Sequence, residues 1–200
     1  MRKMLVNRKP VEGPWGGGNN FIKGLIKHAP DHGFLPVHEF SDDIDLIFMI
    51  DPRYSDLKIS INEIAAYKNW KPDTKVVYRI NECDQRKGLV DDIDPLIKAS
   101  SSVTDQCIFI SDWIQSYHVK EGWMCTENYP IYSGTNTDHF KPREKINNGK
   151  INIVTHHWSD NPLKGQDIYQ LLDNWLEGNE KYTFTYIGRT KGDFKNSQII

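Results

Sequence analysis

The chain has 200 residues, with 25 basic and 27 acidic side chains and a formal net charge of −2. This balance lacks the basic footprint of a nucleic-acid-binding domain and the polybasic cluster of a strong membrane-surface binder, so we expect no nucleic-acid partner. Hydrophobic residues make up 38% of the chain, which is enough for a packed core and too much for a disordered protein.

Short apolar runs alternate with helical stretches through the first 141 residues. The pattern predicts strands at 4–6, 45–50, 75–80 and 106–110, and a short strand at 131–132. Between them it predicts helices at 18–32, 59–70, 94–101 and 112–120. Ser111 is the expected N-cap of the helix at 112–120. Regular alternation of this kind favours parallel strands with right-handed crossovers, and it predicts a doubly wound, Rossmann-like α/β domain over residues 1–141.

The polar segment 142–150 contains Pro and Gly and is typical of a linker. The α/β pattern then restarts, with a strand at 151–155, a helix at 164–176, a strand at 182–187 and the start of another strand after residue 196. One βαβ unit of this size buries little surface by itself. We therefore expect residues 151–200 to begin a second Rossmann-like domain, and the sequence to be a fragment.

The cysteines and the amino-terminal residues indicate a cellular compartment. Cys83, Cys107 and Cys125 are an odd number with no CxxC pair, which favours reduced thiols over a zinc ribbon or a disulfide framework. Residues 1–9 lack the apolar segment of a signal peptide, and the longest uncharged apolar run, 46–50, is too short to span a membrane. We therefore expect a cytoplasmic protein.

Three consecutive glycines, Gly16, Gly17 and Gly18, lie between the first expected strand and the first helix. Ligands bind at this edge of open α/β sheets, and glycines let the backbone approach a ligand and take up positive φ. Their N–H groups and the helix N-terminus favour an anion such as phosphate. The spacing matches neither the GxGxxG fingerprint nor a P-loop, and a flexible loop without a ligand is the alternative.

A second candidate loop spans residues 155–165 after the first strand of the second part. Lys164, followed by Gly165, is expected at the start of a helix, where the dipole disfavours a cation unless a bound phosphate shares the site. A solvated lysine is the alternative. His156 and His157 are neighbours on a strand and point to opposite faces, so we expect no metal site.

A third candidate segment, 78–88, is dense in polar side chains at the end of a strand. Its hydrogen-bonding groups, which suit a sugar, are Arg79, Asn81, Glu82 and Asp84. A mutually paired charge cluster on a loop is the alternative.

Several motifs in the same order resemble the family-4-like glycosyltransferases of the GT-B fold, in which two Rossmann-like domains face each other across a cleft. They are the loop Gly16-Gly17-Gly18, the strand-to-helix step Phe109-Ile110-Ser111-Asp112-Trp113, the segments 131–142 and 151–165, and Tyr186-Ile187-Gly188-Arg189. The chain departs from the family at Ser133-Gly134-Thr135-Asn136, where Asn-Gly-Val-Asp is usual. His157 and Trp158 occupy the region of an arginine that often precedes the donor-site lysine, and the E-x7-E motif does not occur by residue 200.

The resemblance implies a nucleotide-sugar donor, a UDP-sugar or GDP-sugar, with no other cofactor and no required metal. It implies retention at the anomeric carbon and a saccharide or lipid-linked acceptor, the latter with peripheral membrane contact. Donor phosphates would be bound by Gly16, Gly17, Gly18, Lys164 and Gly165, while Asn81 and Glu82 would position the acceptor hydroxyl. Because the E-x7-E motif is missing, we expect weak nucleotide binding or none. A non-catalytic sugar- or nucleotide-binding module and a dinucleotide-dependent oxidoreductase are the alternatives.

Overall fold

A computed structural model describes residues 1–13, 15–123, 127–145 and 147–200. The chain divides into two compact units, Met1–Gly134 and Thr135–Ile200, each with its own hydrophobic core. The interpretations that involve Pro14, Cys125 and Ile146 fall outside the described residues.

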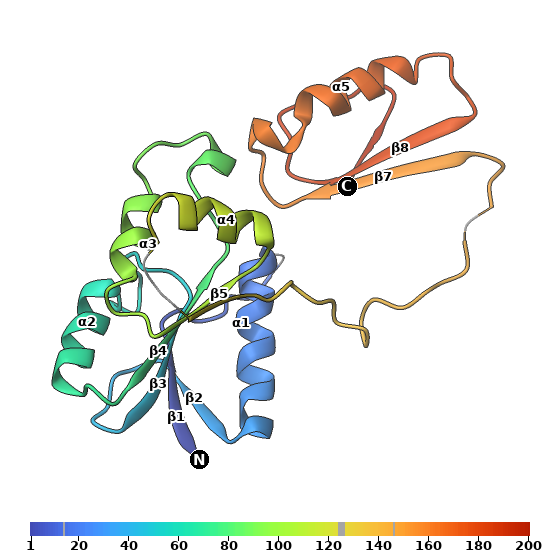
Figure 1. Ribbon diagram of the computed structural model, residues 1–200. Helices are drawn as coiled ribbons and strands as arrows, with labels where there is room; N and C mark the ends of the chain where they lie inside the picture. Colours follow the sequence, from blue (N-terminus) through green and yellow to red (C-terminus); the bar gives the residue numbers. More distant parts are fainter. Residues whose placement is uncertain (14, 124–126, 146) are drawn as a thin grey trace. The chain divides into compact units, whose positions relative to one another are not determined.

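Six strands of the first unit form one sheet in the order β2-β1-β3-β4-β5-β6, and every neighbouring pair is parallel (Figure 1). The strands are β1 (Arg2–Val6), β2 (Phe34–Val37), β3 (Ile44–Met49), β4 (Lys75–Ile80), β5 (Gln106–Phe109) and β6 (Glu127–Pro130). The chain passes from β1 to β2 on one side and then to β3 on the other side of β1, so the direction in which strands are added reverses there. The predicted doubly wound α/β topology is therefore confirmed, and this reversal is where such sheets form a crevice at their carboxyl edge.

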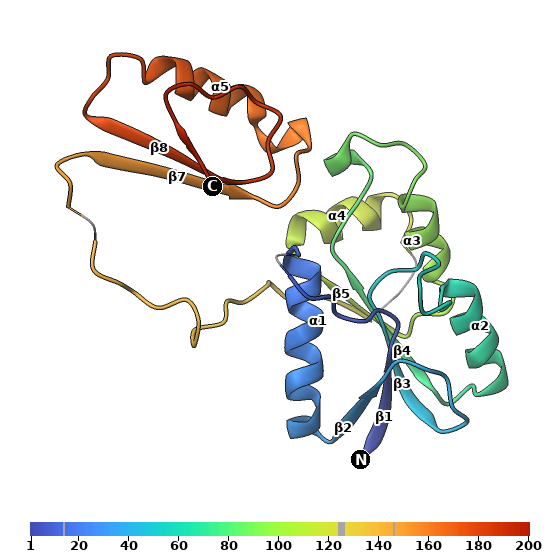
Figure 2. The same ribbon diagram turned by 180° about the vertical axis from the view of Figure 1, so that it is seen from behind.

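Helices cover the sheet on both faces, as Figures 1 and 2 show from opposite sides. Helix α1 (Gly17–His28), continued by the 3-10 turn η1 (Ala29–His32), packs on one face. The other face is covered by α2 (Ile61–Trp70), α3 (Asp94–Ser100) and α4 (Asp112–Lys120). A short 3-10 turn, η2 (Gln85–Lys87), follows β4. In the described ranges no helix combines the length and the apolar character needed to cross a bilayer.

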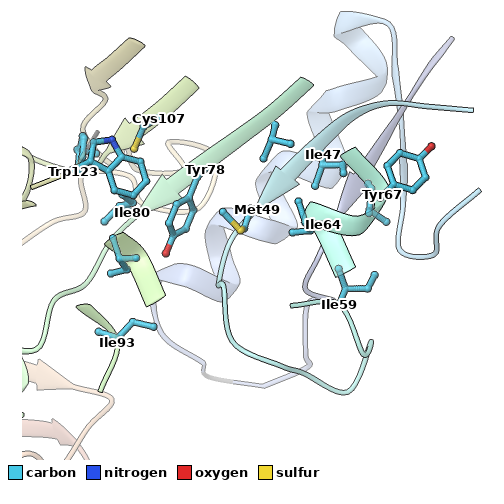
Figure 3. Close-up of a cluster of buried hydrophobic side chains, with 14 of the residues drawn as sticks. Ile47, Met49, Ile59, Ile64, Tyr67, Tyr78, Ile80, Ile93, Cys107 and Trp123 are labelled. Atoms are coloured by element: carbon cyan, nitrogen blue, oxygen red, sulfur yellow. The ribbon is translucent and has the colours of Figure 1, made fainter. Parts of the chain in front are cut away.

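The main core lies between the sheet and α2, α3 and α4 (Figure 3). Tyr78 and Ile80 of β4 contact this side, while the intervening Arg79 turns to the α1 side, as the twofold repeat of a strand requires. Cys107, like Cys83, is a buried free thiol. Parallel strands covered on both faces explain the continuous apolar runs at 4–6 in β1, 46–49 in β3 and 107–109 in β5.

The second unit is a three-stranded parallel sheet in the order β7-β8-β9 with one helix on one face. Its elements are β7 (Ile151–His157), the 3-10 turn η3 (Pro162–Lys164), α5 (Gln166–Trp175), β8 (Tyr182–Gly188) and β9 (Gln198–Ile199). Phe184, Tyr186 and Leu176 form its core against the α5 side. Val154 and Ile187 are exposed on the strands.

Four sequence-based expectations need correction. Strand β2 was not predicted, and β6 lies at Glu127–Pro130 rather than at 131–132. The expected helix at 18–32 ends as an α-helix at His28, because Pro30 lies in the 3-10 turn that follows. Lys164 does not start a helix, because it ends η3 and Gly165 takes a left-handed conformation (φ 84°) before α5 begins at Gln166.

Candidate functional site

A buried amide joins two loops at the carboxyl edge of the six-stranded sheet. Asn7 follows β1 and is fully buried. Its Oδ1 accepts from the N–H of Ile50 (2.7 Å), and its Nδ2 donates to the carbonyls of Asp51 (2.6 Å) and Ile59 (3.4 Å). These bonds fix the loop after β1 to the loop after β3, the two strands that flank the topological switch point.

The glycine loop does lie at this edge, between β1 and α1, as the sequence predicts. Gly16 is the N-cap residue with φ −64°, and Gly17 and Gly18 are the first two residues of α1. None of the three has a positive φ, so the left-handed backbone that glycine allows is not used at these positions. A Cβ built on Gly17 or Gly18 meets no atom of the described chain within 4 Å, so the missing side chains leave open space beside the first turn.

The start of α1 has the character of an anion site. Among the described residues, no side chain caps its first N–H groups, and its first turn contains no acidic residue. The helix dipole therefore presents partial positive charge to the open space. The side-chain amide of Asn19 pairs with both backbone groups of Val11, at 2.8 and 2.9 Å, and anchors the preceding loop to the helix.

A network of charged side chains spans the ends of β1, β3 and β4. Arg53 binds the carboxylates of Asp51 (2.8 Å) and Glu82 (2.7 Å), and Arg8 lies 3.3 Å from Asp51. Lys87 also pairs with Glu82. Burial alone would raise the pKa of Asp51, but the hydrogen bonds from Arg53 and the charge of Arg8 lower it, so this carboxylate stays ionised.

The structure places the candidate residues of segment 78–88 in different environments. The Glu82 side chain is 21% exposed and engaged by two cations, while Asn81 is half-buried and accepts from Arg86 Nη1 through its carbonyl (3.5 Å). Asp84 is buried, and its carboxylate accepts from three backbone N–H groups in residues 92–94. Burial opposes ionisation of Asp84, but these hydrogen bonds prevail and lower its pKa, so Asp84 acts as a structural cap.

Arg79 turns away from this loop, contrary to the expectation that it faces a substrate there. Its guanidinium lies 4.0 Å from the centroid of the Phe21 ring on α1, and the residue is only 5% exposed. Burial lowers the pKa of Arg79. Its Nη1 has no hydrogen-bond partner in the described part of the chain.

In the second unit, the loop after β7 has a defined shape. The Asn161 side chain accepts from the N–H of Leu163 (2.9 Å) and starts the turn that ends at Lys164, whose side chain is exposed. Gly165, with its left-handed backbone, is the N-cap of α5 and provides no side-chain cap. Lys164 and Gly165 thus lie directly before the N-terminus of α5, at the carboxyl edge of the β7-β8-β9 sheet.

His157 lies at the end of β7 and points toward α5. Its Nε2 lies 2.9 Å from the hydroxyl of Tyr169, while His156 is exposed, so the two histidines take opposite faces as expected. Burial, aided by the nearby charges of Lys164 and His156, lowers the pKa of His157. Within the described ranges, no group of three or more His, Cys, Asp or Glu side chains is placed to hold a metal ion.

Three residues of these two edges were not singled out as site residues by their sequence pattern. Asn7 and Arg53 make contacts across 44 and 29 positions of the chain, and periodicity carries no signal for such contacts. Arg189 stands at the end of β8, with its guanidinium 4.2 Å from the Trp158 ring centroid. Only their position in the sequence could have indicated these three residues, because each follows an apolar run that ends at the ligand-facing edge of a sheet.

Comparison with known proteins supports this architecture. No protein-family model and no curated protein sequence matches the chain. Among solved structures, Anabaena Alr3699/HepE in complex with UDP-glucose aligns with 100% of this chain and 69% of its own, at 12% identity and a TM-score of 0.59. The complex of the same protein with UDP and glucose aligns with 95% of this chain and 62% of its own, at 13% identity and a TM-score of 0.61.

Two further solved structures align with this chain to a similar extent. S. aureus MnaA with UDP covers 100% of this chain and 68% of its own, at 10% identity and a TM-score of 0.57. An α-glucosyltransferase with UDP and a 13-mer DNA covers 96% and 58%, at 14% identity and a TM-score of 0.58. This chain thus spans between 58% and 69% of the length of these proteins. With its two parallel α/β sheets, the chain has the fold of the GT-B glycosyltransferases.

Proposed function

We propose that this chain belongs to an enzyme that transfers a sugar from a nucleotide-sugar donor to a saccharide or lipid-linked acceptor. One observation carries the proposal: at the carboxyl edge of each parallel sheet a helix begins directly after a glycine, and no side chain of the described residues caps its first N–H groups. Such a helix start suits phosphate. The similar structures contain UDP or UDP-glucose, which supports a nucleoside diphosphate as the shared ligand class.

We assign the acceptor side to residues 1–141 and donor binding to residues 151–200, joined by 142–150. The donor phosphates would lie against the backbone of Gly16, Gly17 and Gly18 and against Lys164 and Gly165. Asn81 and Glu82 would orient the acceptor hydroxyl. The pairing of Glu82 with Arg53 and Lys87 keeps its carboxylate in place as a hydrogen-bond acceptor.

The chemistry requires little more from the protein than alignment and charge stabilisation. As the bond between the anomeric carbon and the diphosphate breaks, negative charge develops on the leaving oxygen. Helix N–H groups and a lysine stabilise that charge. The acceptor hydroxyl attacks the anomeric carbon on the face from which the diphosphate departs, and its proton passes to the departing phosphate oxygen. We propose retention at that carbon and no metal requirement.

Calorimetric titration of the chain with UDP, GDP and NAD⁺ tests this function. The sequence alone left weak binding or none open, but the two helix starts preceded by glycine lead us to expect weak, saturable binding of UDP or GDP. We expect no binding of NAD⁺. Lys164→Ala should weaken nucleotide binding about tenfold, the loss expected for one charge-assisted contact. The matched control is Lys181→Ala, because Lys181 is also exposed and precedes the amino end of β8.

The results also separate the alternatives. Binding of NAD⁺ in preference to UDP and GDP would favour the oxidoreductase. Nucleotide binding without UDP or GDP release from any nucleotide sugar, in the presence of saccharide acceptors, would favour a non-catalytic binding module. Equal affinities of Lys164→Ala and the unsubstituted chain would remove Lys164 from the donor site.

A further inference from the structure

The stack of Arg189 on Trp158 connects the ends of two neighbouring strands. β7 and β8 are parallel and pair in register up to His157 and Gly188. Trp158 and Arg189 are therefore the first residues after the paired ends, and the guanidinium carbon lies 4.2 Å from the Trp158 ring centroid. This places a cation on an aromatic face at the carboxyl edge, where parallel sheets bind ligands.

The backbone around Arg189 is fixed on both sides. The Arg189 N–H donates to the carbonyl of His157 (3.3 Å), and the Tyr186 hydroxyl donates to the Arg189 carbonyl (2.9 Å). Gly188 has φ 119°, and a Cβ there would lie 2.1 Å from the His157 carbonyl oxygen. The close approach of the two strands thus depends on glycine at this position, and it determines where Arg189 leaves the sheet.

The loop that carries Arg189 meets the first turn of α5. The Gln166 side-chain amide donates to the Thr190 hydroxyl (3.5 Å), and that hydroxyl accepts from the N–H of Gly192 (2.9 Å). Lys164 ends η3 and directly precedes Gly165, the N-cap residue of α5. Arg189 and Lys164 therefore flank the same helix N-terminus.

Two acidic residues lie near these cations in the chain. Asp160 pairs with Lys191 (3.3 Å), while Asp167, in the first turn of α5, is exposed. Within the part of the chain that the structure describes, no carboxylate lies within ion-pair distance of Lys164 or Arg189.

We propose that Arg189, held by Trp158, is a second cationic ligand of the donor diphosphate, acting together with Lys164. This inference rests on the proposed function and adds a residue to its donor site. A guanidinium presents a planar fork that binds two phosphate oxygens at once, and stacking on an aromatic ring restricts its orientation before the ligand arrives. Two cations beside a helix N-terminus match the charge of a diphosphate better than one lysine alone.

Calorimetric titrations of the unsubstituted chain and of Arg189→Ala with UDP, GDP, inorganic pyrophosphate and uridine test the inference. We expect Arg189→Ala to weaken pyrophosphate and the preferred nucleoside diphosphate by about tenfold, and to leave any uridine binding unchanged. Arg2→Ala is the matched control, because Arg2 stacks on Phe34 at 4.3 Å but lies at the amino end of β1. Thermal unfolding of each variant identifies any loss of folding.

The indole N–H resonance of Trp158, assigned with Trp158→Phe, gives a second readout. We expect pyrophosphate to shift this resonance in the unsubstituted chain and in Arg2→Ala, and not in Arg189→Ala. If the unsubstituted chain binds none of the diphosphates, both the proposed function and the role of Arg189 are wrong. If it binds them and Arg189→Ala binds equally well, the role of Arg189 alone is wrong.

Discussion

The buried side-chain amide of Asn7 joins the loops at the switch point of the first sheet. Replacing Asn7 with Ala leaves three backbone groups, at Ile50, Asp51 and Ile59, without the partners they have now. We expect the free energy of unfolding in urea to fall by roughly 2–4 kcal/mol, since each unsatisfied buried group costs about 1–3 kcal/mol and the loops relax in part. Asn20→Ala is the control, because Asn20 is exposed on α1 and the change should have little effect.

Gly17 allows stability and ligand binding to be separated. A Cβ at this position meets nothing within 4 Å, and alanine favours a helix over glycine by about 1 kcal/mol. Gly17→Ala should therefore keep or raise the melting temperature while it weakens UDP binding, because the methyl group occupies the approach to the first-turn N–H groups. Gly24→Ala in the same helix also has open space and should leave UDP binding unchanged. Unchanged binding by both variants would exclude the glycine loop as a phosphate site.

His157 makes the second unit sensitive to pH. Burial, Lys164 and His156 lower its pKa below the ordinary value of 6.5, so the unfolded chain takes up a proton at a higher pH than the folded chain. The contribution of His157 to the free energy of unfolding is therefore fully present above about pH 6.5, and it is lost as the pH drops toward the folded pKa. An NMR titration of the His157 ring should give a pKa below 6.5, and His157→Gln should remove this part of the pH dependence. A ring that titrates at 6.5 or above would contradict the described environment.

At the scale of elements, Asp173 joins α5 to the segment that leads into β9. It is fully buried, and its carboxylate accepts from the N–H groups of Lys195 (2.8 Å) and Asn196 (2.9 Å) and from the Ser197 hydroxyl (2.5 Å). Asp173→Ala should increase amide hydrogen exchange through residues 195–199 and lower the free energy of unfolding by about 2–4 kcal/mol. Asp167→Ala, an exposed carboxylate on the same helix, should leave exchange there unchanged.

The sequence predicts some elements well because they carry a local signal. Helix α2 was predicted at 59–70 and is found at Ile61–Trp70, where Ser60 and Glu63 form a capping box. Ser111 caps α4 as predicted, by accepting from the N–H of Ile114 (3.3 Å). Strand β2 was missed and β6 misplaced because both are short edge strands, and Pro36 and Pro130 interrupt any alternation that would identify them.

The placement of the candidate residues could likewise be predicted only where a local signal indicates it. A strand followed by glycine identified the edges that carry Gly16 to Gly18 and Lys164. The partners of Glu82 were not predictable, because Arg53 comes from the loop after another strand, 29 residues away. The roles of Asn81, Glu82 and the glycine loop stay predictions.

At the scale of the whole molecule, the two units differ in the size of their cores. Among the described residues, sixteen buried ones form the main cluster of the first unit, whereas the cluster of the second unit has three, Leu176, Phe184 and Tyr186. We therefore expect backbone amides of β7 and β8 to exchange with solvent faster than those of β3 and β4. Phe184→Ala should widen this difference, and Ile64→Ala should narrow it. Equal protection in the two sheets would contradict the expectation.

The two prolines at the borders of the six-stranded sheet have a consequence for association between molecules. β2 and β6 are its outermost strands, and each contains a residue without a backbone N–H, Pro36 or Pro130. An incoming strand cannot form a continuous ladder against such a border. At high concentration, both prolines therefore disfavour aggregation by pairing of edge strands between molecules. We expect Pro36→Val or Pro130→Val to form β-rich aggregates at concentrations at which the unsubstituted chain does not.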